Sequence, residues 1–580
     1  MVGGAAWELV GVGAVIPLLA AVVDPERLIR AAAFTPLRDL LTPENVLWIA
    51  CLSVFGLFVL KNAYLALLTL AKSRFVARAK VALETQLFQG YLHAPYEFHL
   101  ARNSAQSISN IQHVTGAVYH VLLPMLVFAS ELLVFAGISC LLLWVQPFAT
   151  IAAFAACGIV SFVLMRTLKG RVSALGENQV RLNRALLQSK QQALHGIKDV
   201  KVLARQAHFL DGFHRFAIEL ARTGAQLQVL NQVPRIVLEI AVVGGIMLVV
   251  VIVTSTARDT TSALTSIALL ATAALRLMPS LNRMLASAIS IRAYAPAVRL
   301  VHEDLMQTAG YAPRLDAALA PSKTPALSGL NHSIELEDVC FAYAGARDRP
   351  ALRNVTLAIS KGTSAAFVGQ SGAGKTTLVD LLLGLLRPTS GRVLADGIAV
   401  GDLGEGWLRT IGYVPQTVYL ADDTLARNVA FGLPDALIDR ARIQAALEMA
   451  HLSDLVATLP QGIDASIGEH GGRLSGGQRQ RIGIARALYH DPEVIILDEA
   501  TAALDSETEH QISEAVRSLI GRKTVIIIAH RLSTIRHCDA IYFLDDGTLA
   551  GSGTFDELYR SSADFRRLCE FAMLKLPGDP

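Results

Sequence analysis

Glycine, lysine and threonine residues occur between 369 and 377 in a spacing suited to phosphate binding, and the segment reads GQSGAGKTT. It fits the pattern GxxxxGK followed by Ser or Thr, and it follows the apolar run 364–368, as a strand–loop–helix motif requires. Glycines let backbone N–H groups approach phosphates, and a helix N-terminus adds its positive dipole end. We expect Lys375 to contact the β- and γ-phosphates and the Thr376 hydroxyl to bind Mg²⁺. The predicted ATP-binding loop consists of Gly369, Gln370, Ser371, Gly372, Ala373, Gly374, Lys375, Thr376 and Thr377.

Two adjacent acids could complete the chemistry of ATP hydrolysis. The short apolar run 494–497 has the pattern of a buried parallel strand, and Asp498 and Glu499 follow it directly. A carboxylate there can hold Mg²⁺ through water, and a second one can orient the attacking water as general base. This pattern is weak alone and gains its meaning from the phosphate loop upstream. The six cysteines form no CxxC pair, so we expect neither a cysteine metal site nor a disulfide framework.

The segment LSGGQ at 474–478 points to a family. Here the sequence resembles the ATP-binding-cassette transporters, in which this signature opens a helix and caps the γ-phosphate bound to the other subunit. The resemblance implies an aspartate at the same subunit interface, in AALD at 502–505. The residues that it implies for ATP binding in trans are Ser475, Gly476, Gly477, Gln478 and Asp505.

Other residues match the same family in order and spacing. Tyr343 resembles the aromatic residue that stacks on adenine, and Gln416 resembles the glutamine that contacts Mg²⁺ and water. His530 resembles the switch histidine at the γ-phosphate, although a lone histidine would more simply be a core residue. The resemblance thus implies Glu499, His530 and Gln416 as catalytic residues, and Thr376, Gln416 and Asp498 as Mg²⁺ ligands. One departure is Ala502, where the family usually has serine.

Composition separates an apolar first half from a second half like an ordinary soluble domain. Hydrophobic residues make up 52% and charged residues 17%, and the mean hydropathy is +0.43. The net charge of +3 argues neither for nor against a nucleic-acid partner, but the apolar spans of the first half exclude a soluble cassette ATPase acting on ribosomes or DNA, so we expect no such partner. A spanning helix needs about 20 mostly apolar residues. We count six candidate spans, at 5–23, 46–71, 118–144, 148–167, 236–254 and 262–289.

Charge patterning sets the expected topology. The first span could be mistaken for a signal peptide, but it has no basic start and contains Glu8, so we expect a membrane anchor. Basic residues concentrate in 72–117 and 168–235, which places both segments and the C-terminal domain on the cytoplasmic side of the cell (inner) membrane. Helical periodicity over 175–203 predicts that the spans continue far beyond the bilayer. We expect a membrane domain at 1–308, a linker at 309–332 and a nucleotide-binding domain at 333–570.

The resemblance implies an exporter that works as a homodimer. One chain carries one phosphate loop and one signature, whereas each ATP site of the family takes these parts from different cassettes. GEHG at 468–471 resembles the GExG element of exporter-type cassettes. The expected fold is an α-helical six-span membrane domain fused to an α/β P-loop domain. Two alternatives stay open: an exporter of hydrophobic drugs or peptides, and a cassette protein that regulates a channel with little turnover, against which Glu499 and His530 argue.

Ionisable residues within spans are costly and are therefore candidates for substrate contact. Lys61 lies in the second span, and Arg276 and Arg283 lie seven residues apart in the last span, on one helical face near Pro279. These cations either form an anion site for a phosphate or pyrophosphate headgroup, or line the mouth of the cytoplasmic cavity or pair with Glu131 or Glu239.

Short segments favour the anion site. The sequences GAVIPLL at 13–19, GIKDVK at 196–201, NQVPR at 231–235 and PSLNR at 279–283 resemble PglK-type flippases of lipid-linked oligosaccharides. This resemblance implies a lipid-linked or amphiphilic substrate in a lipid bilayer. It also implies an amphipathic helix after the first span, for which 25–41 is the counterpart unless that segment is a plain connector.

Overall fold

The computed structural model describes residues 2–13, 46–145, 147–256, 260–311, 329–346, 348–468, 471–498, 506–528 and 535–573. The chain divides into two compact units, Met1–Ala94 with Phe98–Leu319 and Pro95–Glu97 with Ala320–Pro580. The possible amphipathic helix at 25–41 and most of the expected linker lie outside the described residues.

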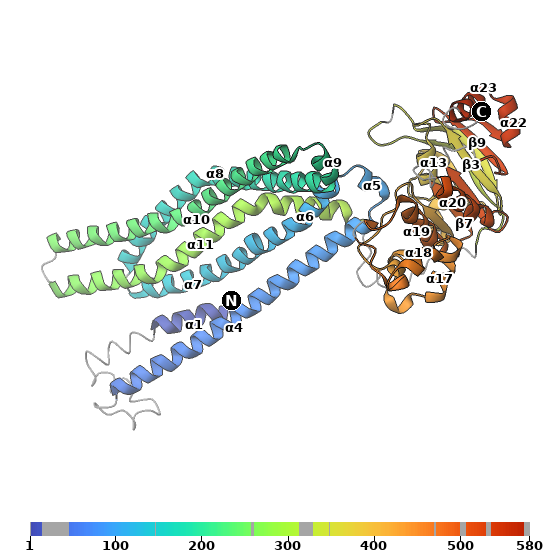
Figure 1. Ribbon diagram of the computed structural model, residues 1–580. Helices are drawn as coiled ribbons and strands as arrows, with labels where there is room; N and C mark the ends of the chain where they lie inside the picture. Colours follow the sequence, from blue (N-terminus) through green and yellow to red (C-terminus); the bar gives the residue numbers. More distant parts are fainter. Residues whose placement is uncertain are drawn as a thin grey trace. The chain divides into compact units, whose positions relative to one another are not determined.

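The first unit is built from long helices (Figure 1). Four of them have 48 to 51 residues, which corresponds to about 72–77 Å at 1.5 Å per residue. The hydrocarbon core of a bilayer is about 30 Å thick, so these helices reach well beyond it. The helices of this unit are α1 (Val2–Gly13), α4 (Val46–His93), α6 (Ser104–Ala117), η3 (Val118–Leu122), α7 (Leu123–Val145), α8 (Pro147–His195), α9 (Ile197–Val202), α10 (Gln206–Thr256) and α11 (Thr260–Thr308). The short helix α5 (Tyr96–Leu100) bridges the boundary between the two units in the sequence.

Within the described residues, four helical stretches are long and apolar enough to cross a membrane: Leu47–His93, Ser104–Cys140, Gln206–Gly245 and Leu277–Thr308. The expected span at 148–167 lies within α8, and the first expected span, 5–23, is described only as far as α1 reaches. Side chains such as Trp48, Leu52 and Phe55 on α4 are largely exposed. Exposed apolar side chains on such helices suit a lipid environment, where no apolar surface needs to be hidden from water.

Small residues and buried apolar side chains hold these helices together. The helices α8, α10 and α11 pack side by side (Figure 1), with Leu164, Val172, Leu227 and Ile289 buried among them. At Gly176 on α8, an added Cβ would lie 2.0 Å from the backbone oxygen of Ala293 on α11. Only glycine allows the two backbones to approach so closely.

The second unit contains two sheets. The larger has the strand order β10-β9-β3-β8-β7-β6, and the smaller has the order β2-β1-β4-β5. Strands β9, β3, β8, β7 and β6 are parallel to one another, and β10 is antiparallel to β9. The strands are β1 (Ser333–Phe341), β2 (Leu352–Ser360), β3 (Ser364–Gly369), β4 (Ser390–Ala395), β5 (Ile398–Ala399), β6 (Ile411–Val414), β7 (Val494–Asp498), β8 (Thr524–Ile528), β9 (Ala540–Asp545) and β10 (Thr548–Gly553).

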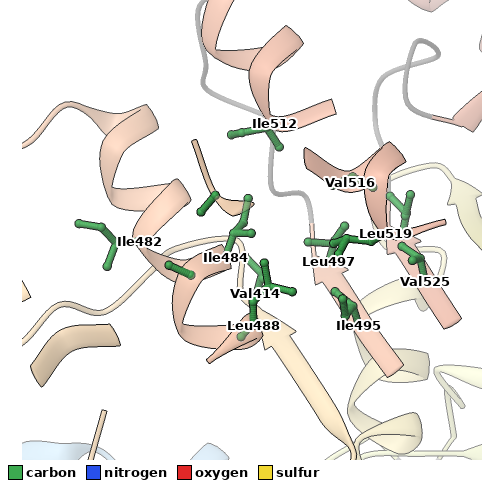
Figure 2. Packing of buried hydrophobic residues seen from close by; sticks show 14 of the residues in the cluster. Val414, Ile482, Ile484, Leu488, Ile495, Leu497, Ile512, Val516, Leu519 and Val525 are labelled. Carbon is green, nitrogen blue, oxygen red and sulfur yellow. The ribbon is translucent and has the colours of Figure 1, made fainter. Parts of the chain in front are cut away.

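Both faces of the larger sheet are apolar and packed, because successive side chains along its strands point to opposite faces. In β7, Val494 and Ile496 belong to one hydrophobic core, whereas Ile495 and Leu497 belong to another, as the two-residue period of a strand requires. Figure 2 shows part of the second core, in which residues of α19 (Gly476–Leu488) and α20 (Ser506–Leu519) pack with residues of β6, β7 and β8. The helices of this unit also include α13 (Lys375–Leu382), α14 (Val400–Leu403), α15 (Glu405–Leu408), α16 (Leu425–Val429), α17 (Arg440–Met449), α18 (Ser453–Thr458), α22 (Phe555–Ser561) and α23 (Ala563–Met573).

Candidate nucleotide site and charges of the membrane unit

The phosphate loop connects β3 to α13. Gly372 and Gly374 have φ angles of +86° and +95°, a region that only glycine adopts without strain. A Cβ at Gly374 would also lie 2.6 Å from the backbone oxygen of Ala351. Lys375 is 6% exposed, and its Nζ donates to the carbonyl oxygens of Gly369 at 2.8 Å and Gln370 at 2.9 Å. The ammonium group is therefore held across the loop, next to the N-terminus of α13.

Tyr343 lies beside this loop. Its hydroxyl is 3.0 Å from Thr377 Oγ1, and its ring packs edge-on against Phe341, with 4.9 Å between the ring centroids. The structure thus brings together the residue expected to stack on adenine and the residues expected to bind phosphate, although 34 positions separate Tyr343 from Thr377.

Parallel strands bring the other polar residues to the same edge of the sheet. The carboxyl ends of β3, β8, β7 and β6 lie side by side because these strands are neighbours and parallel. Asp498 ends β7 and is 6% exposed, and it accepts a 3.3 Å hydrogen bond from the hydroxyl of Tyr413 on β6. Gln416 follows β6 by two residues. Glu499, Asp505 and His530, like Ala502 and residues 469 and 470, lie outside the described residues.

Asp380 on α13 is a second carboxylate near Asp498. Burial, with the charge of Asp498 added, raises the pKa of Asp380 to about 6. Burial and the charge of Asp498 also raise the pKa of the Tyr413 hydroxyl. The charge of Asp498 that raises the pKa of Asp380 creates a negative potential, and such a potential suits a divalent cation. Asp380 and Tyr413 were not among the residues expected from the sequence. The signal for Asp380 is a lone acid in the apolar segment LVDLLL at 378–383.

The signature segment forms the start of α19. Ser475 is the N-cap residue: its Oγ accepts from the backbone N–H of Gln478 at 3.1 Å, and Gln478 Oε1 accepts from the backbone N–H of Ser475 at 2.9 Å. This reciprocal capping box fixes the first turn. Ser475 and Gly476 are exposed. An exposed, capped helix N-terminus is an anion-binding surface.

Of the three cations proposed for substrate contact, the two whose side chains the structure describes have carboxylate partners. Lys61 Nζ lies 2.5 Å from Glu8 Oε2, and its side chain is 8% exposed. Arg283 Nε lies 2.6 Å from Glu131 Oε1, and its Nη2 donates to Glu131 Oε2 at 3.1 Å. Of the alternatives for Arg283, pairing with Glu131 is the one observed. Glu8 as a partner of Lys61 was not expected, and the side chain of Arg276 lies outside the described part.

Comparisons with known proteins agree with this architecture. The family model described as "ABC transporter" matches residues 352–502. An ATP-dependent lipid A-core flippase of Cupriavidus pinatubonensis is 32% identical over 491 residues, which cover 83% of this chain and 80% of that protein. A flippase of the same name from Ralstonia nicotianae is 49% identical over 227 residues, which cover 39% of this chain and 38% of that protein. A bacterial Atm1-family ABC exporter with ATP bound has a TM-score of 0.79 at 26% identity, covering 100% of this chain and 98% of that one. The chain therefore belongs to the ABC transporter family, as a half-transporter of the exporter type whose ATPase domain drives transport.

Proposed function

We propose that this transporter works as a homodimer that flips an amphiphilic glycolipid with a phosphate-bearing headgroup across the membrane. The observation that carries this proposal is the similarity to a lipid A-core flippase over 83% of the chain, combined with a single phosphate loop and a single signature segment. A lipid-linked oligosaccharide with a pyrophosphate group belongs to the same chemical class, because it also joins a glycan to a lipid through charged phosphate.

The chain's own residues suit the hydrolysis of ATP with Mg²⁺. Thr376, Asp498 and Gln416 supply the oxygen ligands that Mg²⁺ prefers, and the paired acids Asp498 and Asp380 provide a negative potential for it. Bound Mg²⁺ would neutralise charge on the β- and γ-phosphates. Lys375 would bind those phosphates, Glu499 would orient the attacking water, and His530 would contact the γ-phosphate.

The two ATP sites of the proposed homodimer would be composite. Ser475 at the start of α19 and Asp505 would face nucleotide held by Lys375 of the partner subunit. The basic residues in 72–117 and 168–235 support a nucleotide-binding domain on the cytoplasmic side of the inner membrane.

Lys61, Arg276 and Arg283 remain the proposed contacts for the headgroup within the membrane. Moving an anionic group through a bilayer without a partner is prohibitively costly, and guanidinium groups grip phosphate oxygens bidentately. Two such arginines in each chain would give the homodimer four. Arg283 would have to exchange Glu131 for phosphate, since the two side chains are bonded in the structure.

Proteoliposomes containing the purified transporter would test the proposal. ATP-dependent flipping of a fluorescent polyprenyl-pyrophosphate disaccharide, together with stimulation of ATP hydrolysis by it, is the expected result. Stimulation by uncharged amphiphiles alone would instead identify an exporter of hydrophobic drugs or peptides. Negligible steady-state hydrolysis would favour a channel regulator.

A further inference from the structure

The membrane unit contains a partly open cavity of about 370 Å³, lined by both polar and apolar side chains of α6, η3, α8 and α11. Its α8 residues fall between Gly176 and Lys190, after the expected span 148–167 and within the basic segment expected on the cytoplasmic side. The cavity is therefore placed where a headgroup from the cytoplasmic leaflet would arrive first. None of its lining residues takes part in the nucleotide site.

The lining offers hydrogen-bond donors and a positive charge. Its polar side chains include Gln112, His120, Gln179, Asn183, Lys190 and Tyr294. No aspartate or glutamate lines the cavity among the residues that the structure describes. Lysine and amide donors without a carboxylate favour a ligand rich in acceptor oxygens and negative charge.

Lys190 differs from the two cations discussed above. Its Nζ lies 5.7 Å from the ring centroid of Phe213, whereas Lys61 and Arg283 each bond a carboxylate. An aromatic face attracts an ammonium group but does not neutralise it. Among the described residues no carboxylate forms an ion pair with Lys190, so its ammonium group can contact an anionic ligand.

Contacts among the lining residues fix one side of the cavity. The five-residue π-helix η3 interrupts the helix at Val118–Leu122, and such π turns occur frequently at functional sites. It brings His120 onto Tyr294 of α11, where the rings stack with 4.0 Å between centroids and an interplanar angle of 11°. Ser290 Oγ donates to the backbone oxygen of His120 at 2.9 Å, and Gln179 Nε2 is 3.4 Å from the Tyr294 hydroxyl.

We propose that this cavity binds the anionic, acceptor-rich headgroup of the transported amphiphile on the cytoplasmic side, with Lys190 and the amides of Gln179 and Asn183 as its contacts. The inference rests on the proposed function and identifies where its substrate is first bound. The same chemistry could belong to a glycosyl pyrophosphate that carries no lipid, so the experiment must separate the two sources.

Two probes separate the two sources: the fluorescent polyprenyl-pyrophosphate disaccharide and the water-soluble disaccharide pyrophosphate without its lipid. Dissociation constants are measured on the full-length protein in nanodiscs, and flipping is measured in proteoliposomes. We expect Gln179→Leu and Lys190→Gln each to weaken binding about tenfold, since the first removes a hydrogen bond to a charged group and the second removes the positive charge. Lys190→Arg, which keeps the charge, should bind nearly as the wild type does.

Gln188 on the same helix provides the matched control. It is exposed and does not line the cavity, and nine residues from Gln179 correspond to about half a turn in rotation. Gln188→Leu should keep the wild-type dissociation constant and basal hydrolysis, and melting temperatures show that every variant folds. The inference would be overturned if both Gln179→Leu and Lys190→Gln bound the probes as tightly as the wild type does. It would also be overturned if the wild type bound neither probe. Binding that depends on Gln179 without any flipping would support the cavity and overturn the lipid-flippase proposal.

Discussion

Lys375 is held in place by the loop that it serves. Its two hydrogen bonds to carbonyl oxygens of Gly369 and Gln370 keep the ammonium group beside the N-terminus of α13, so phosphate binding needs little rearrangement there. Glu499 has a different role, because it follows the strand that ends in Asp498 and would act on water. The two side chains should therefore fail in different ways when they are replaced.

Replacing Glu499 by glutamine should leave ATP bound but unhydrolysed. Loss of a general base typically costs about 10²- to 10⁴-fold in rate, while the amide preserves the shape of the side chain. Lys375→Ala should instead weaken nucleotide binding itself. Equilibrium binding of a fluorescent ATP analogue and steady-state phosphate release distinguish the two effects. A Glu499→Gln protein that turns over at the wild-type rate would remove this residue from the proposed mechanism.

The pair Arg283–Glu131 allows a test of the proposed anion site. Glu131→Gln would release Arg283 from its carboxylate, so the headgroup would no longer compete with Glu131, and the half-saturating concentration of the pyrophosphate probe should fall. Arg283→Ala should raise that concentration, and Arg283→Lys should restore it only in part because lysine grips phosphate at a single point. Unimpaired flipping by the double variant Arg276→Ala/Arg283→Ala would show that neither arginine is needed for transport and that the Arg283–Glu131 pair is purely structural.

The phosphate loop could be predicted from local spacing, whereas contacts between residues far apart in the sequence could not. The residues from Gly369 to Thr377 are adjacent in sequence, and their spacing alone carries the chemistry. Lys61 and Glu8 are 53 positions apart, and no pattern links them. The cavity draws His120, Asn183 and Tyr294 from three separate helices, so it exists only once those helices have packed.

At the scale of helices, Gly176 sets the distance between α8 and α11. A methyl group there would meet the backbone oxygen of Ala293 at 2.0 Å, which neither backbone can avoid without moving. Gly176→Ala should destabilise the protein by about 1–3 kcal/mol, as overpacking does, and the melting temperature in detergent measures this effect.

Gly170 on the same helix is the control for that substitution. A Cβ at Gly170 meets nothing within 4 Å, and alanine favours a helix over glycine by up to about 1 kcal/mol. Gly170→Ala should therefore leave the melting temperature unchanged or raise it. Equal destabilisation by both substitutions would show that close packing is not the reason for glycine at 176.

A buried carboxylate joins the ends of several helical segments. Asp304 on α11 is 4% exposed, and it accepts from Arg102 at 3.0 Å, from Asn110 on α6 at 2.6 Å, and from the hydroxyl of Tyr91 on α4. Removing one partner of a buried pair leaves the other charge unsatisfied. Asp304 therefore fastens α4, α6 and α11 at one point.

Asp304→Ala should lower the stability of the membrane unit by about 3–5 kcal/mol, the usual cost of breaking a buried ion pair. Its neighbour Glu303 is exposed, so Glu303→Ala should change the melting temperature little. Thermal unfolding of both variants in the same detergent makes the comparison. Similar melting temperatures for Asp304→Ala and the wild type would mean that the contacts of Asp304 are energetically unimportant.

For the whole molecule, apolar runs predicted membrane helices, and the resemblance of the cassette motifs implied an exporter with an α/β nucleotide-binding domain, in agreement with the similarity to a bacterial Atm1-family ABC exporter. Apolar runs located the helices because lipid demands continuous helical hydrogen bonding. The expected span 148–167 occupies only part of α8, which runs from Pro147 to His195. Hydropathy measures how much of a helix suits lipid, so it cannot give the end of a helix that continues into water.

The assembly of the ATP sites can be tested by mixing two defective chains. Each site is proposed to take Lys375 from one chain and Ser475 from the other. In a pure Lys375→Ala dimer, and likewise in a pure Ser475→Arg dimer, both sites are then defective. A dimer of one chain of each kind has one site with both defects and one intact site. Two affinity tags would isolate this mixed dimer, and single-turnover hydrolysis should reveal its one active site while both pure dimers stay inactive. An inactive mixed dimer would contradict the composite site, because each chain would then need both its own Lys375 and its own Ser475. Full activity in a pure mutant dimer would show that the residue replaced there is not needed for hydrolysis.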